Sequence, residues 1–72
     1  MNTLNVIIEK SENNYSAYIA EIDGIVGAGK EIDDVKQSIA NSIKIFIESC
    51  KELGCDIPQE LKEEVALVYK TE

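Results

Sequence analysis

The sequence predicts an α+β domain of two layers, in which one long helix packs on a sheet of four strands. Apolar residues recur at helical spacing over residues 31–53. Three short segments before this helix, and one after it, alternate apolar and polar residues as strands do. The chain has 72 residues, which is enough for one domain over 1–72 and for no second core. We therefore expect the element order β-β-β-α-β, with a three-stranded antiparallel meander before the helix.

The predicted helix has a clear beginning and end. Glu31, Asp33 and Asp34 lie in or just before its first turn, where the helix dipole favours negative charge. Gly54 follows it in a position suited to a left-handed residue, and Pro58 opposes its continuation. An apolar stripe is expected to face the sheet; it consists of Ile32, Val35, Ile39, Ile43, Phe46, Cys50 and Leu53, widened by Ala40 and Ile47.

The strands are predicted at residues 3–10, 15–22, 25–29 and 64–70. Polar and glycine-containing turns separate the first three, which makes them consecutive antiparallel neighbours. If the last strand pairs parallel beside the first, the spatial order is third, second, first, fourth. An alternative for residues 59–68 is a helix, because the connector has no strong breaker after Pro58.

The charge balance points towards a basic partner. The chain has 14 acidic residues and 7 basic ones, all of them lysine, with no histidine and a net charge of −7. Such a chain repels phosphate backbones, so we expect no direct binding of nucleic acid. A basic protein would be attracted to it. The alternative is that the acidity serves solubility alone.

Membrane, secretion and metal-binding signals are missing from the sequence. No apolar run approaches the roughly 20 residues of a membrane span, and the N-terminus does not resemble a signal peptide. We expect a cytoplasmic protein with no membrane contact. Cys50 and Cys55 cannot supply four ligands to zinc, so we expect no metal site and take Cys50 as a small buried hydrophobe. A disulfide between the two cysteines is the alternative.

Residues 24–30 match the opening of a phosphate-binding P-loop. The next residue should be serine or threonine to hold magnesium, but Glu31 would place a negative charge there. The preceding segment also resembles one strand of a hairpin rather than a buried parallel strand. The absence of histidine removes the usual general base near neutral pH. We therefore expect no catalysis and no cofactor.

Short motifs along nearly the whole chain resemble the HicB antitoxin family. They are Glu9-Lys10, Tyr18, Glu21, Gly24, Gly29, the Asp33-Asp34 pair, Leu53-Gly54 and Ile57-Pro58. Asp23 stands where the family usually has proline, and Glu31 where it usually has a threonine cap. Both departures concern turn chemistry more than function.

The resemblance implies a truncated RNase H-like fold without nuclease chemistry. Catalysis of that type needs carboxylates on the first strand, whose centre here is Val6, Ile7 and Ile8. HicB antitoxins neutralise HicA, a small basic ribonuclease, by covering its active surface. Many also carry a C-terminal DNA-binding part, so this chain is either a short member or a fragment. The alternative is a stand-alone oligomeric domain that binds another protein or a small ligand.

Two surfaces are candidates for binding. The first lies on the helix face opposite the apolar stripe, where Ile45 is the anchor among polar and acidic residues: Asp34, Asn41, Glu48 and Glu52. A single exposed isoleucine often has no role, which is the alternative. The second is the sheet face away from the helix, where we expect Ile7 and Tyr18 to support self-association into a homo-oligomer.

Overall fold

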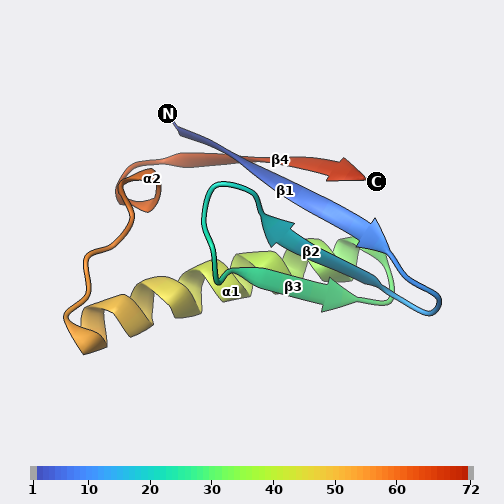
Figure 1. Cartoon of the computed structure of the whole chain (residues 1–72), viewed down its shortest axis with the longest axis horizontal. Helices are drawn as coiled ribbons and strands as arrows, with labels where there is room; N and C mark the ends of the chain where they lie inside the picture. Colours follow the sequence, from blue (N-terminus) through green and yellow to red (C-terminus); the bar gives the residue numbers. More distant parts are fainter. Residues whose placement is uncertain (1, 72) are drawn as a thin grey trace.

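The computed structural model describes residues 2–71 as a four-stranded mixed sheet with a long helix on one face (Figure 1). Its elements are β1 (Asn2–Lys10), β2 (Tyr15–Ile19), β3 (Val26–Gly29), α1 (Ile32–Leu53), α2 (Gln59–Lys62) and β4 (Val65–Thr71). The sheet order is β3-β2-β1-β4, with β1 antiparallel to β2 and parallel to β4. The predicted fold class and strand order are confirmed.

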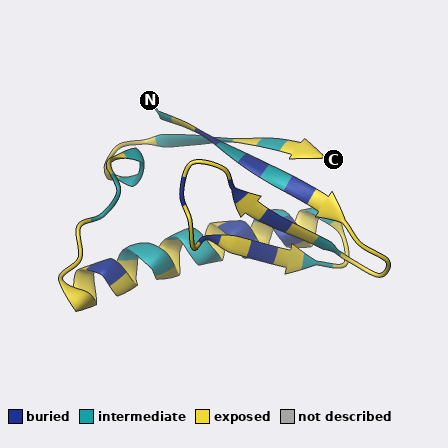
Figure 2. Cartoon of the chain, viewed as in Figure 1, coloured by how far each residue is buried: buried dark blue, intermediate teal, exposed yellow. Residues whose placement is uncertain are grey.

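The core lies between the sheet and the N-terminal half of α1 (Figure 2). Leu4, Val6 and Ile8 alternate along β1 and are buried, as the period of two predicts. Val35 and Ile39 of α1 are also completely buried. Burying such a side chain contributes about 1.5–3 kcal/mol, so this small cluster supplies much of the driving force for folding.

The C-terminal half of α1 extends beyond the sheet. The helix has 22 residues, about 33 Å at 1.5 Å per residue. The neighbouring β3 has only 4 residues, about 13 Å of strand. Leu53 is 78% exposed and Ala40 is also exposed, so the prediction that both belong to the buried stripe is wrong. Too little of the sheet lies opposite Leu53 to cover it, whereas Ala40 is exposed because α1 packs over β3 and β2 and leaves an open groove on the side of β4.

The strand β2 ends at Ile19, three residues before the predicted end at residue 22. The last ladder bond runs from the Ala20 N–H to the Asn5 carbonyl, at 2.9 Å. The N–H of Asn5 then donates to the Glu21 carboxylate at 2.9 Å. The Glu21 side chain therefore replaces the backbone carbonyl that a longer β2 would have supplied as acceptor. After this bond the chain leaves the sheet.

The ends of α1 form as the sequence predicts. Glu31 has extended backbone at the N-cap, and its N–H donates to the Asp34 carboxylate at 3.3 Å. Gly54 has a φ of 72°, the left-handed conformation that favours glycine, and the Cys55 N–H donates to the Cys50 carbonyl at 2.9 Å. Cys50 is buried, as predicted, and both cysteines are free, so the alternative of a disulfide is wrong.

The connector after α1 contains one short helical turn, α2, and then β4. The alternative of a helix over residues 59–68 is therefore wrong beyond Lys62. Residues 65–71 form a strand because alternate side chains pack against the edge of the core beside β1; these are Val65, Leu67 and Tyr69.

Candidate protein-binding site

The candidate anchor Ile45 is 62% exposed on the outer surface of α1. Four other candidate residues, Asp34, Asn41, Glu48 and Glu52, are also exposed. At about 100° per residue all five lie within roughly 60° of one another around the helix axis. The structure therefore brings them onto one stripe, though it spreads them over nearly the whole helix.

Asp34 has a local structural role that sets it apart from the other four. Its carboxylate accepts the backbone N–H of Glu31 at the beginning of the helix. It also lies about 16 Å along the axis from Ile45, at 1.5 Å per residue. Asn41, Glu48 and Glu52 are closer, within about 10 Å by the same measure. The compact part of the candidate site therefore surrounds Ile45.

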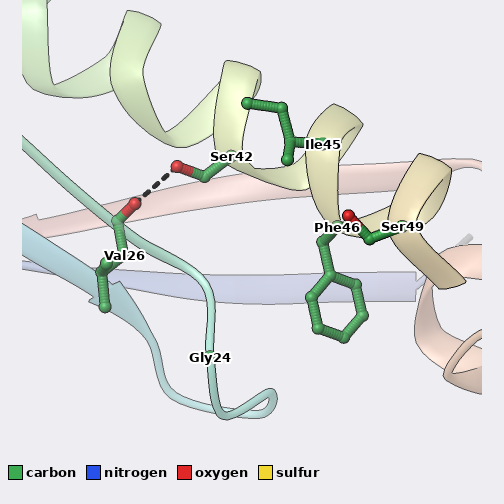
Figure 3. Close-up of a pocket in the computed structure, with 6 residues that line it drawn as sticks. All are labelled: Gly24, Val26, Ser42, Ile45, Phe46 and Ser49. Carbon is green, nitrogen blue, oxygen red and sulfur yellow. Dashed lines mark hydrogen bonds between the residues drawn. The ribbon is translucent and has the colours of Figure 1, made fainter.

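Ile45 lies beside a hollow of 280 Å³ between α1 and the segment that leads into β3 (Figure 3). The hollow is lined by Gly24, Val26, Ser42, Ile45, Phe46 and Ser49. The ring of Phe46 points towards Gly24, where an added Cβ would lie 3.8 Å from the ring. Ile45 is thus part of a small surface depression with apolar and hydroxyl groups.

Two serines of α1, Ser38 and Ser42, bond to β3, and Ser42 also lines this hollow. The Ser42 hydroxyl donates to the Val26 carbonyl at 2.6 Å (Figure 3). The Ala28 N–H donates to the Ser38 hydroxyl at 3.2 Å. These backbone groups of β3 point away from β2, because Ile19 and Ile25 form the neighbouring bonded pair. The serines therefore occupy the free edge of β3.

Sequence reasoning missed the hollow, although it found Ile45. Phe46 belongs to the predicted core stripe and packs against the core, but it is only half-buried because a loop, and not the sheet, lies beside it. Ser38 and Ser42 are one helical turn apart and therefore lie on the same face of the helix. This spacing is the one sequence feature that indicates that both serines could bond to the same neighbouring strand. Their hydrogen-bond partners could not be predicted from the sequence, since these are backbone groups of β3, a different element.

The candidate site combines exposed apolar side chains with carboxylates on one face of α1. An apolar side chain of a partner could contact Ile45 and Phe46, while Glu48 and Glu52 on the same helix attract basic groups. Within residues 2–71, no three histidine, cysteine or acidic residues come close enough to hold a metal ion. No helix in the same range is long and apolar enough to cross a bilayer.

The second candidate surface is the sheet face opposite α1. Ile7 of β1 is the cross-strand neighbour of Tyr18 in β2, and Tyr18 is in turn the neighbour of Val26 in β3. Tyr18 is 41% exposed and Ile7 is half-buried. The structure therefore brings the two predicted residues together in an apolar row across three strands.

The chain is similar in sequence to a protein of Helicobacter pylori. It is 32% identical over 44 residues to a "UPF0150 protein" of Helicobacter pylori. The matched segment is 61% of this chain and 61% of the relative, so the chain spans about three-fifths of that protein's length. No protein-family model matches the chain, and no solved structure matches it significantly. The similarity supports a relationship to the UPF0150 family and assigns no activity to the chain.

Proposed function

We propose that the chain is an antitoxin-type module that neutralises a small basic ribonuclease of the HicA type by covering its active surface. The observation that carries the proposal is the exposed Ile45 at an apolar hollow, with carboxylates on the same helix face of a chain of net charge −7. The resemblance of the sequence to HicB antitoxins supports it. The similarity to the UPF0150 protein adds a family-level link.

Neutralisation in this scheme needs binding and no catalysis. An apolar side chain of the toxin contacts Ile45 and Phe46, and water is excluded around it. Glu48 and Glu52 attract lysine and arginine side chains that the toxin would otherwise use to hold RNA phosphates. The toxin's basic surface is then occupied by protein. The chain itself binds no nucleic acid, metal or cofactor in this proposal, and it acts in the cytoplasm as a homo-oligomer.

A second candidate is a stand-alone oligomeric domain that binds a small ligand or another protein. The hollow at Phe46 has a volume of 280 Å³, close to the lower limit of about 300 Å³ for small-molecule pockets. It is open on one side and lined by two hydroxyl groups, Ser42 and Ser49. A small neutral ligand would fit these features better than a charged one.

Co-purification tests the first candidate. The chain is expressed together with a small basic protein encoded beside it, and the mixture is separated by size-exclusion chromatography. The proposal predicts one co-eluting complex that Ile45→Asp disrupts. Leu53→Asp is the matched control, because Leu53 is an exposed apolar residue at the end of the same helix. Separate elution of the two proteins, or a complex disrupted only by the control, would contradict the proposal.

A further inference from the structure

The two edges of the sheet differ in whether their backbone groups have partners. At β3, Ser38 accepts the outward N–H of Ala28 and Ser42 donates to the outward C=O of Val26, so α1 covers this edge. At the other edge, β4 pairs only with β1 within residues 2–71. An unblocked edge strand can pair with a strand of another chain. The edge formed by β4 is therefore the one available for association.

The backbone of β4 shows which of its groups face outward. The Asn2 N–H donates to the Glu64 carbonyl at 3.2 Å, so the polar groups of Glu64 face β1. Backbone groups of successive residues in a strand alternate between its two sides. The N–H and C=O groups of Val65, Leu67 and Tyr69 consequently point away from β1, towards the open edge.

The composition of β4 also favours association. Val65–Thr71 has the sequence VALVYKT, without an acidic residue, in a chain of net charge −7. Lys70 is its one charged residue. A copy of the same chain would meet least repulsion along this strand. Long apolar edges of this kind are association sites unless they are protected.

An apolar groove of 330 Å³ runs beside β4 on the helix side. It exists because α1 packs mainly over β3 and β2, which leaves Val65 and Leu67 half-exposed next to Ile43 and Ile47. Leu61 and Glu63 of the connector also line it, and within residues 2–71 Glu63 is its one charged residue. Side chains from a strand added at the β4 edge would lie over this groove.

We propose that a second copy of the chain pairs its β4 antiparallel to this β4 across a twofold axis, joining two four-stranded sheets into one. Several registers align the outward backbone groups, among them one centred on Leu67 and one centred on Val68. The first places Lys70 opposite Glu64 of the second copy, whereas the second places it opposite Ala66. The attraction of opposite charges selects the register centred on Leu67.

This register also covers the apolar groove. Residues opposite each other in an antiparallel pair project from the same face of the sheet. Leu67 then meets its own copy on the helix side, and Val65 meets Tyr69 of the second copy. Both contacts are apolar and both lie next to the groove. The contact is on the opposite edge of the sheet from the hollow at Ile45, so it deepens the homo-oligomer of the proposed function and does not depend on toxin binding.

Sedimentation velocity over a range of concentrations tests the contact. We expect a species of twice the 8.0 kDa chain mass. Lys70→Glu should raise the dissociation constant about tenfold, because two like-charged pairs replace two attractive ones in the symmetric dimer. The double variant Lys70→Glu with Glu64→Lys should restore dimerisation, since it exchanges the two charges. Both residues are exposed, so neither change should affect folding.

Two further measurements distinguish this contact from other occupants of the surface. Leu67→Pro removes an outward N–H and should give a monomer. The Tyr69 amide proton should exchange slowly with solvent in the dimer and rapidly after dilution. A monomer at every concentration would overturn the proposal. A dimer whose dissociation constant is unchanged by the charge variants, but which Tyr18→Asp dissociates, would also overturn it. Slow exchange of the Tyr69 amide proton that appears only when a toxin is added would do the same.

Discussion

The carboxylate of Glu21 accepts two hydrogen bonds from Asn5, one from the backbone N–H at 2.9 Å and one from the side-chain amide at 2.6 Å. The two residues are 16 positions apart in sequence. This contact continues the β1–β2 ladder by one bond after β2 has ended. Both bonds hold the pKa of Glu21 below its usual value of 4.5, and the bond from the Asn5 backbone has the larger effect.

The lowered pKa predicts how stability depends on pH. Because the folded state binds the proton less well than the unfolded state, the stabilisation is complete above pH 4.5 and is lost as the pH falls through the folded pKa. We expect Glu21→Gln to cost at most about 1 kcal/mol near neutral pH, since the site is exposed. Urea unfolding of both proteins from pH 7 to pH 3 measures this difference. A difference that stays constant over this range would contradict the assignment.

The hydrogen bond from Ser42 to β3 should stabilise the fold. We expect Ser42→Ala to lower the free energy of unfolding by about 1 kcal/mol, because the Val26 carbonyl loses its partner. Ser49→Ala is the control, since it makes the same change in helix propensity beside the same hollow. Thermal unfolding followed by circular dichroism compares the two. Equal stability of the two variants would remove Ser42 from this role.

Gly29 lies where the helix begins against β3. An added Cβ would be 2.5 Å from the Asp34 Cβ and 3.0 Å from the Val35 nitrogen, so backbone would have to move. We expect Gly29→Ala to cost about 2 kcal/mol. The same change at Gly54 meets nothing within 4 Å and should cost only about 1 kcal/mol, from its left-handed φ. Chemical denaturation of both variants ranks them, and the opposite ranking would contradict the packing described.

Ile45 should matter for binding and not for folding. Ile45→Asp replaces a side chain that is 62% exposed, so we expect no loss of stability. Binding to the toxin should weaken more than about tenfold, because a charge would then face the partner's apolar group. Isothermal titration calorimetry gives the affinity, and circular dichroism checks the fold. Unchanged affinity would remove Ile45 from the site.

Much of the fold could be predicted because it depends on local patterns. The period of the apolar residues identifies α1, and the alternation of Leu4, Val6 and Ile8 identifies β1. The parallel position of β4 beside β1 follows from topology once the helix is recognised. These features need no knowledge of distant contacts.

The errors arose where a side chain contacts a different element. The end of β2 depends on Glu21 bonding to Asn5, which no local pattern reveals. The exposure of Leu53 depends on how far the sheet extends under α1. Within the candidate site, Ile45 could be identified because it is an apolar residue on the polar helix face. That Phe46 and Ser42 line a hollow could not be predicted, because the hollow is formed with the loop and β3 beside them.

We propose that this chain blocks a ribonuclease by covering its active surface. The most direct test uses a small basic protein encoded beside this chain, and titrates the purified chain into an RNA-cleavage assay of that protein. We expect cleavage to fall in proportion to the added chain and to disappear at equal molar amounts. Undiminished cleavage in the presence of an excess of folded chain would contradict it.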